Sequence, residues 1–472
     1  MQVMDKLRSF RAMLMVLLIF LNALPRATSA GIMQPDVLVV GGTPAGVAAA
    51  VAAARCGKRV DLVANRPHLG GILTDAMMDQ WDLNLSREGM PIEGGIFKEI
   101  YARLGDSFTP AQAAAVFDGL AAAEPLIHVI TEAVPTGVDT ANAAGSRLVT
   151  GVRFRAERTR AAFAIDAPYV IDASDDGDVA ALAGARFDLG RQDTGRDERM
   201  QPVTLMFSLT GVDWGRVEAS YSSLRDGFGG ATDRRAWGYA RLLSAYRPSE
   251  PGVVVADLNL GHESGGSVTV NAIDILGIDG CRDADLARAR SVAEREAPRL
   301  VAWLRRRIPG FEDAAIGRYA DAMYVRETRH FAGLERLTAD EIWDGRIPGD
   351  TIGLSSYPLD LHPLTLGEKP AFAPVRHVYG VPFGSLIPRG FGNLILASPA
   401  ISASHLASGS ARVIPTTIEE GEAAGTAAAL ALADRTDFVT FAGCRREVAA
   451  LRALLERRGV ILLTNPIEIS QK

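Results

Sequence analysis

The sequence predicts an α/β fold built on a dinucleotide-binding Rossmann unit, and three neighbouring features near its N-terminus support this. Residues 36–40 are a short, mostly apolar run, which is typical of a buried parallel strand. A glycine-rich turn follows at once, and residues 44–55 are nearly all alanine and valine, which favours a helix lying close on a sheet. Residues 60–63 indicate a second strand. A strand, a glycine turn, a helix and a strand in this order form the context that a dinucleotide fingerprint requires.

The glycine turn contains the first candidate binding residues. Glycine lets the backbone turn tightly and approach a pyrophosphate, which the N–H groups and the dipole of the helix N-terminus then stabilise. Thr43 departs from the common pattern, because glycine is usual at the third fingerprint position. The candidate residues of this turn are Gly41, Gly42, Thr43, Pro44, Ala45 and Gly46.

The end of the second strand lacks the acid that usually holds a ribose hydroxyl. Ala64 stands there, followed by Asn65. An amide bonds a ribose more weakly than a carboxylate does, because charge-assisted hydrogen bonds are roughly twice as strong as neutral ones. We expect Asn65 to contact the nucleotide, together with the Leu69, Gly70 and Gly71 that follow.

The segments GGTPAG and HLGGILT, with the alanine-rich helix between them, resemble the start of the bacterial FAD-dependent oxidoreductase family. That family is similar to glutathione-reductase-type flavoproteins and to the flavin part of heterodisulfide reductase. Its members often carry GGTPAG, so the resemblance implies that Thr43 is tolerated, whereas Ala64 replaces their usual glutamate. The resemblance implies FAD as cofactor, a glutathione-reductase-type FAD-binding Rossmann domain and an oxidoreductase activity.

A second stretch, residues 170–178 (VIDASDDGD), is a buried strand entering an acidic turn. It resembles the family's DATGDGDLAA, with Asp175 in place of a glycine. In that pattern the turn closes over the FAD pyrophosphate. A calcium loop is the alternative, but the spacing differs from that of an EF-hand. The resemblance assigns to the cofactor Asp172, Ala173, Asp176 and Gly177, and also Val134, which occupies a position that often flanks the adenine.

The chain changes character between residues 195 and 375, where alternating segments and a long charged helix at 283–308, interrupted by Pro298, predict an inserted α+β substrate domain. Within it, YVRETRH at 324–330 resembles the family's VRETR segment. Two arginines beside a strand suit an anionic or hydroxylated substrate, and we select Arg326 as a catalytic residue. An internal ion-pair network is the alternative. The FAD-binding domain is then expected at 34–194 and 376–472.

After another buried strand, residues 401–416 resemble the family's ISxSHxAHGSxRVxPT. A helix beginning near Pro415 would direct its N-terminus at the flavin and stabilise the negative charge of the reduced ring. His405 is the histidine in this segment, and we expect it to act as a general base, with a purely structural role as the alternative. Arg412 is expected to hold the flavin or a substrate anion. Ser398-Pro399-Ala400 and Gly384 differ from the family's residues.

The resemblance covers about residues 36–460 and predicts a hydride transfer from a small organic substrate to flavin N5, followed by reoxidation by an electron acceptor. A flavin-binding protein with degenerate or no turnover is the alternative. A NAD-dependent dehydrogenase would need a second, independent GxGxxG unit, which the sequence does not contain.

Composition and charge argue against other classes of protein. The net charge of −6 and the lack of a long basic run argue against nucleic-acid binding. Cys56, Cys281 and Cys444 lie far apart and form no CxxC, so no disulfide framework, cluster or metal site is predicted.

Residues 1–30 have the pattern of a signal peptide, with basic residues, an apolar run at 12–21 and small residues at 27–30. The apolar run is too short for a stable membrane span. This predicts a periplasmic or secreted protein. Translation from Met33, which would give a cytoplasmic enzyme, is the alternative.

Overall fold

The structure is a computed structural model that describes residues 34–462 apart from 87–88, 144 and 225–228. The predicted signal peptide and Met33 lie outside these residues. Within the described part of the chain, no helix combines the length and the apolar character that crossing a membrane requires.

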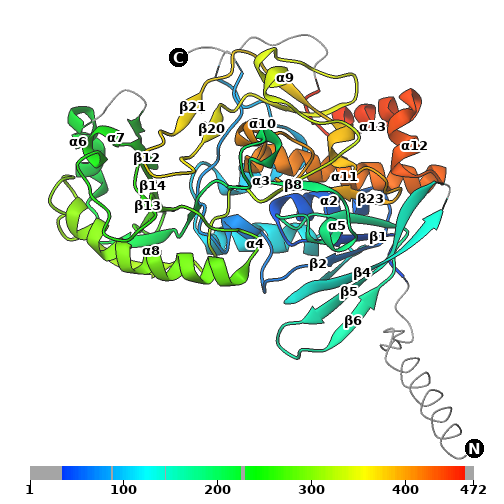
Figure 1. The fold of residues 1–472 in the computed structure, drawn as a ribbon, viewed down its shortest axis with the longest axis horizontal. Helices are drawn as coiled ribbons and strands as arrows, with labels where there is room; N and C mark the ends of the chain where they lie inside the picture. The colour runs from blue at the N-terminus through cyan, green and yellow to red at the C-terminus, as the bar shows by residue number, and fades with distance from the viewer. Residues whose placement is uncertain (1–33, 87–88, 144, 225–228, 463–472) are drawn as a thin grey trace, which may run out of the picture.

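A five-stranded parallel sheet forms the centre of the larger unit (Figure 1). Its strands lie in the order β23-β7-β1-β2-β3, so the strand before the glycine turn is the middle one. This order confirms the predicted Rossmann-like α/β domain, while the finer glutathione-reductase-type architecture stays a prediction. The strands are β1 (Val37–Val40), β2 (Val60–Val63), β3 (Ile127–Ile130), β7 (Tyr169–Asp172) and β23 (Leu394–Leu396).

Two long, small-residue helices pack directly against each other in this unit. A Cβ atom added at Gly421 would lie 2.1 Å from Ala45 O, and one at Gly425 would lie 2.1 Å from Ala49 O. Glycine therefore lets the two helix backbones approach closely. The helices of this unit are α2 (Pro44–Arg55), α3 (Gly95–Leu104), α4 (Pro110–Ala122), α5 (Asp178–Leu182), α10 (His405–Ala411), α11 (Ile414–Asp434), α12 (Phe438–Gly443) and α13 (Arg445–Arg457).

An antiparallel meander extends from one side of the parallel sheet, at the lower right of Figure 1. It comprises β4 (Ala133–Ala143), β5 (Ser146–Ala156) and β6 (Ala162–Ile165). Its first residues lie beside the end of β2, because Ala133 N donates to Ala64 O.

A second unit, at the left of Figure 1, is built on a six-stranded antiparallel sheet. Its long helix, α8 (Asp283–Leu304), runs through Pro298, so the predicted interruption there is wrong. The carbonyl of Glu294, which Pro298 cannot bond, accepts a hydrogen bond from Tyr319 Oη at 3.4 Å instead. The other elements are β9 (Val203–Thr204), β10 (Phe207–Thr210), α6 (Trp214–Leu224), β11 (Gly230–Ala231), β12 (Arg235–Gly238), α7 (Ala240–Leu243), β13 (Val253–Val254), β14 (Leu258–His262), β15 (Val268–Asn271), β16 (Asp274–Ile275) and β17 (Ala315–Tyr319).

Each unit has its own hydrophobic core. The core of the second unit is formed by Met77 and by buried side chains between Val203 and Ala320, whereas buried side chains between Phe331 and Leu386 join the core of the parallel sheet. The domain limits expected at 195 and 375 stay a prediction. The remaining elements are η1 (Gly71–Leu73), β8 (Phe187–Leu189), η2 (Gln192–Thr194), β18 (Arg329–Phe331), α9 (Ala339–Trp343), β19 (Thr351–Ser355), β20 (Leu359–Leu361), β21 (Ala371–Ala373), β22 (Tyr379–Pro382) and η3 (Phe383–Leu386).

Candidate active site

The glycine turn between β1 and α2 lies against the end of β7. Gly41 has a φ of +124°, and a Cβ atom there would lie 2.2 Å from Ala173 O, so only glycine fits. Thr43 is the N-cap of α2, and its hydroxyl accepts from Gly46 N at 3.0 Å and donates to Ala173 O at 2.9 Å. The threonine that departs from the common fingerprint therefore caps the helix and connects two strand ends.

One cavity of about 760 Å³ starts at this turn and continues to the N-terminus of α11. It is lined by the residues after β2, by the start of the meander and by the turn after β7. Residues 322–329 also line it, and Thr328 Oγ1 donates to Asp176 at 2.8 Å. Eleven of the residues predicted from the sequence line it: Gly41, Gly42, Thr43, Pro44, Ala45, Asn65, Gly71, Val134, Asp176, Arg326 and Arg412.

The other predicted residues do not line the cavity but support its walls: Gly46, Leu69, Gly70, Asp172, Ala173, Gly177, His405 and Pro415. Asp172, for example, accepts hydrogen bonds from Ser174 and from Ala180 N at 2.8 Å, and so fixes the turn and the start of α5. Burial raises the pKa of this carboxyl to about 7. The structure thus brings the predicted nucleotide residues to one place, some as lining and some as support.

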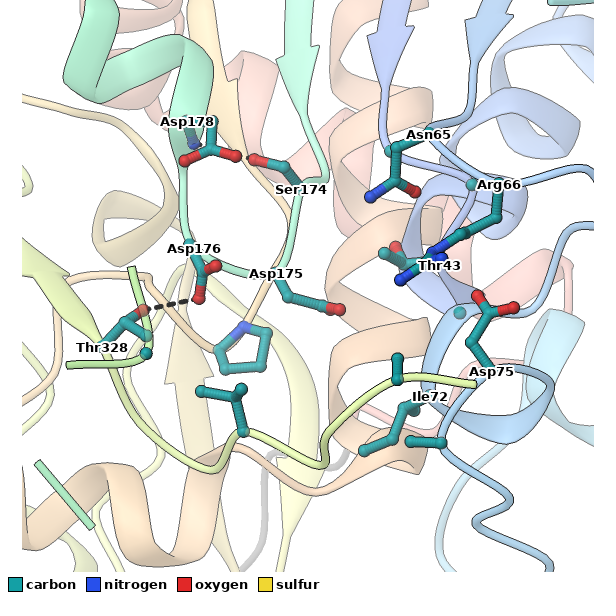
Figure 2. A pocket seen from close by; sticks show the side chains of 18 of the residues that line it. Thr43, Asn65, Arg66, Ile72, Asp75, Ser174, Asp175, Asp176, Asp178 and Thr328 are labelled. Atoms are coloured by element: carbon teal, nitrogen blue, oxygen red, sulfur yellow. Dashed lines mark hydrogen bonds between the residues drawn. The ribbon is translucent and has the colours of Figure 1, made fainter. Parts of the chain in front are cut away.

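Acidic side chains crowd the turn after β7. Figure 2 shows Asp175 extending into the cavity, with Asp176 on one side and Thr43, Arg66 and Asp75 on the other. The surrounding protein, together with Asp176, Asp75 and Asp178, raises the pKa of Asp175 to about 7. Burial likewise raises the pKa of Asp75 and that of Asp176 to about 6. Some of this negative charge is therefore titratable near neutral pH.

The other end of the cavity, formed by Tyr324, Arg326 and Arg412, is called the deep end below. Arg412 Nη1 donates to Tyr324 Oη at 2.7 Å, and the guanidinium carbon of Arg326 lies 4.4 Å from the centre of the same ring. The Arg326 Nη1 atom donates to Pro202 O at 3.0 Å and to Thr204 Oγ1 at 2.8 Å. The two guanidinium groups are thus held around one phenol.

Three polar residues that do not line the cavity support the deep end. Arg326 pairs with Asp274 at 3.2 Å, and Arg412 pairs with Asp360 at 3.1 Å. His362 joins the two carboxylates, through Nδ1 to Asp274 at 2.7 Å and through Nε2 to Asp360 at 3.7 Å. Burial and Arg326 lower the pKa of His362, but the two carboxylates outweigh them and raise it to about 9. This imidazole is therefore a cation at neutral pH.

His405 lies behind the cavity wall. Its Nδ1 is 2.7 Å from Glu327 Oε1, and His330 Nε2 is 2.8 Å from the same oxygen. Burial would raise the pKa of Glu327, but the two imidazoles lower it to about 2. Glu327 lines the cavity and His405 does not, so His405 reaches the cavity only through Glu327.

Several residues that line the cavity are not among those predicted from the sequence. Asp82 lines it near Arg412, and burial and Asp360 raise the pKa of its carboxyl. Arg66 follows the position of the missing ribose acid, and Asp175 was noted only as a departure from the family pattern. Tyr324 begins the YVRETRH segment. The signals were present in the motifs, but nothing in the sequence showed which side chains face the ligand.

The comparisons with known proteins identify the family. The model of the family described as FAD dependent oxidoreductase matches residues 36–455. The chain belongs to this family. It is therefore an FAD-dependent oxidoreductase, and the cavity fits the cofactor because the glycine turn and the first turn of α2 line it and form a cradle for a pyrophosphate. The likeness to glutathione-reductase-type proteins and to heterodisulfide reductase stays a prediction.

Solved structures overlap with this chain only loosely. p-Nitrophenol 4-monooxygenase PnpA from Pseudomonas putida DLL-E4 is 11% identical, with a TM-score of 0.43 over 90% of this chain and 86% of that chain. A geranylgeranyl bacteriochlorophyll reductase-like protein from Thermoplasma acidophilum is 14% identical, with a TM-score of 0.41 over 91% and 84%. The flavin-dependent brominase Bmp2 is 11% identical, with a TM-score of 0.44 over 90% and 84%. These values are too low to carry an argument about substrate or reaction. No curated protein matches the sequence.

Proposed function

We propose that this chain oxidises a small organic substrate at the deep end of the cavity. FAD, when bound, supplies the hydride acceptor at N5, and an electron acceptor later reoxidises it. The observation that carries the proposal is the continuity of the cavity. The same space that begins at the dinucleotide turn reaches the first residue of α11 and the buried side chains of Arg326 and Arg412.

The two ends of the cavity have different tasks. The glycine turn and the N-terminus of α2 hold the pyrophosphate, and Asn65 and Val134 hold the nucleoside. At the other end Ile414 and Thr417, from the first turn of α11, line the cavity. The unpaired N–H groups and the dipole of a helix N-terminus favour negative charge on a group bound there, which favours the reduced cofactor.

We propose Asp82 as the group that takes the proton which the substrate loses with its hydride. Its side chain is open to the cavity, and its raised pKa makes it a stronger base than an ordinary aspartate. The role of His405 as a base stays a prediction, and it would act through Glu327. His405 does not line the cavity, and its Nδ1 is held 2.7 Å from Glu327 Oε1.

Anaerobic reduction tests the proposal. Purified protein carrying FAD is mixed with a panel of small hydroxy acids, amino acids and alcohols, and the bleaching of the flavin absorbance is followed. Saturable bleaching by at least one compound supports the proposal. Bleaching by dithionite but by no member of a broad panel favours a flavin-binding protein without turnover.

A periplasmic or secreted location is a separate proposal that rests on residues 1–30 of the sequence. N-terminal sequencing of the native protein checks it. A mature N-terminus near Gly31 in the periplasmic fraction supports export, and a cytosolic protein starting at Met33 contradicts it.

A further inference from the structure

Each of the two arginines of the deep end, Arg326 and Arg412, has one hydrogen-bond donor without a partner among the described residues. Arg326 is 4% exposed and Arg412 is 8% exposed, and both line the cavity. The Nε atom of each is buried and has no hydrogen-bond partner among the described residues. A buried donor left without a partner is costly, and more so on a charged group. We propose that Arg326 and Arg412 bind the carboxylate group of the substrate, so that the substrate is a small organic acid. This inference rests on the function proposed above and names its substrate class.

A structural ion pair elsewhere in the chain shows the contrast. Arg191 is also 8% exposed, but it does not line the cavity. Its Nε donates to Asp197 Oδ1 at 2.6 Å and its Nη2 donates to Asp197 Oδ2 at 2.7 Å. These two parallel hydrogen bonds satisfy the Nε and Nη2 donors of Arg191, as expected for a bidentate ion pair that binds no ligand. Arg326 and Arg412 lack such a bidentate pair.

The carboxylates that accompany the two arginines lie behind them. Asp274 and Asp360 do not line the cavity, whereas Arg326 and Arg412 do. His362 is a third cation that is hydrogen-bonded to Asp274 and forms an ion pair with Asp360, so each carboxylate divides its charge between an arginine and the imidazole. The positive charge that faces the cavity is therefore only partly offset from behind.

Tyr324 makes the two arginines converge. One guanidinium bonds its hydroxyl and the other lies over its ring, so both are held beside the same side chain. The planar fork of an arginine matches the two oxygens of a carboxylate. A phosphate dianion fits less well, because its second negative charge would stand beside Asp82.

The position of Asp82 connects binding with chemistry. A carboxylate bound at the arginines is a like charge near Asp82, and it raises the pKa of Asp82 further. Asp82 then becomes a stronger base for a proton of the same substrate. Asp257 does not line the cavity, but it interacts electrostatically with His362 and Arg326. Burial raises its pKa to about 6.

Binding without turnover tests the inference. Acetate, propanoate, 2,2-dimethylpropanoate and benzoate are each titrated into the FAD-loaded protein, alongside the amide of the same acid, and dissociation constants are read from the perturbed flavin spectrum. Each amide has the shape of its acid without the charge. We expect at least one acid to bind about tenfold or more tightly than its amide, because a hydrogen bond to a charged group is worth roughly ten- to hundredfold in binding.

Substitution then assigns the preference to the arginines. In Arg326→Met the ratio of amide to acid dissociation constants should fall to within about threefold of unity, while the FAD dissociation constant stays within about twofold. Arg191→Met, which also removes a buried, paired arginine, should leave the ratio unchanged. If Arg326→Met does not fold, Arg326→Lys and Arg412→Lys keep the charge beside Asp274 and Asp360, and each should lower the ratio by at least about threefold.

The inference is overturned if no acid binds more tightly than its amide, or if the preference survives in Arg326→Met or in both lysine variants. It is also overturned if Arg412→Lys changes only the affinity for FAD, because Arg412 would then bind the flavin. The proposed function fails in a different way. Acid preference without any flavin reduction keeps the anion site and refutes the oxidation, whereas reduction by a neutral substrate without acid preference does the reverse.

Discussion

The carboxylate of Asp175 should make FAD binding dependent on pH. This side chain extends into the cavity beside the cradle for the pyrophosphate, where the resembling family has a glycine (Figure 2). Burial, together with the like charges of Asp176, Asp75 and Asp178, already raises its pKa to about 7. Two cations, Arg66 and Arg329, also line the cavity. A bound pyrophosphate adds negative charge and raises this pKa further, so the protein takes up a proton when FAD binds.

The sign and size follow from linkage between the two events. Below pH 7 Asp175 is protonated in the free protein, and FAD binds without an electrostatic cost from this residue. As the pH rises above that value, binding weakens by up to about tenfold for each unit by which FAD raises the pKa. Because Asp175 is open to the solvent of the cavity, screening reduces the effect, and we expect roughly three- to tenfold at pH 8.

Equilibrium dialysis of flavin-free protein with FAD from pH 6 to pH 9 measures this dependence. Asp175→Asn and Asp175→Gly should bind FAD roughly three- to tenfold more tightly than wild type at pH 8 and about equally at pH 6. Asp233→Asn, which alters an exposed aspartate of the second unit, is the matched control and should behave as wild type. Equal affinities at pH 8, or a difference that is the same at both pH values, would refute the reasoning.

Three further outcomes are expected. Thr43→Val removes the helix cap and should lower the free energy of unfolding by about 1–2 kcal/mol in a denaturant titration, while Thr43→Ser should retain most of it. Gly425→Ala places a methyl group 2.1 Å from a backbone oxygen of α2 and should cost about 1–3 kcal/mol, whereas Gly119→Ala in α4 meets nothing within 4 Å and should be neutral or stabilising. Asp82→Asn should slow anaerobic flavin reduction by about 100-fold or more, and His405→Asn by less than about tenfold, with the bound flavin spectrum intact in both. The reverse order would support His405 as the base.

The sequence predicted the parts of the fold that depend on local pattern. The apolar run, the glycine turn and the alanine-rich helix have a spacing that only a strand-turn-helix unit satisfies, and the structure confirms them as β1 and α2. Pro298 shows the limit of such reasoning. A proline breaks an isolated helix, but Tyr319, distant in sequence, supplies the hydrogen bond that compensates for it.

The candidate site was predictable at its cofactor end and much less so at its substrate end. The pyrophosphate cradle is local, so its residues follow from one motif. The residues in and around the deep end come from separated segments that only the tertiary fold brings together. They include Asp82, Tyr324, Asp360, His362 and Arg412. His405 was selected because of its motif, but the orientation of its ring toward Glu327 depends on packing that no motif encodes.

A deuterium isotope effect on flavin reduction tests the central claim most directly. A substrate found in the reduction panel is prepared with deuterium on the carbon that is oxidised, and single-turnover reduction is followed without oxygen. Hydride transfer from that carbon predicts that the deuterated substrate reduces the flavin several-fold more slowly, in wild type and in Asp175→Asn alike. Equal rates for the two substrates, under conditions where chemistry limits reduction, would contradict a hydride transfer in this cavity.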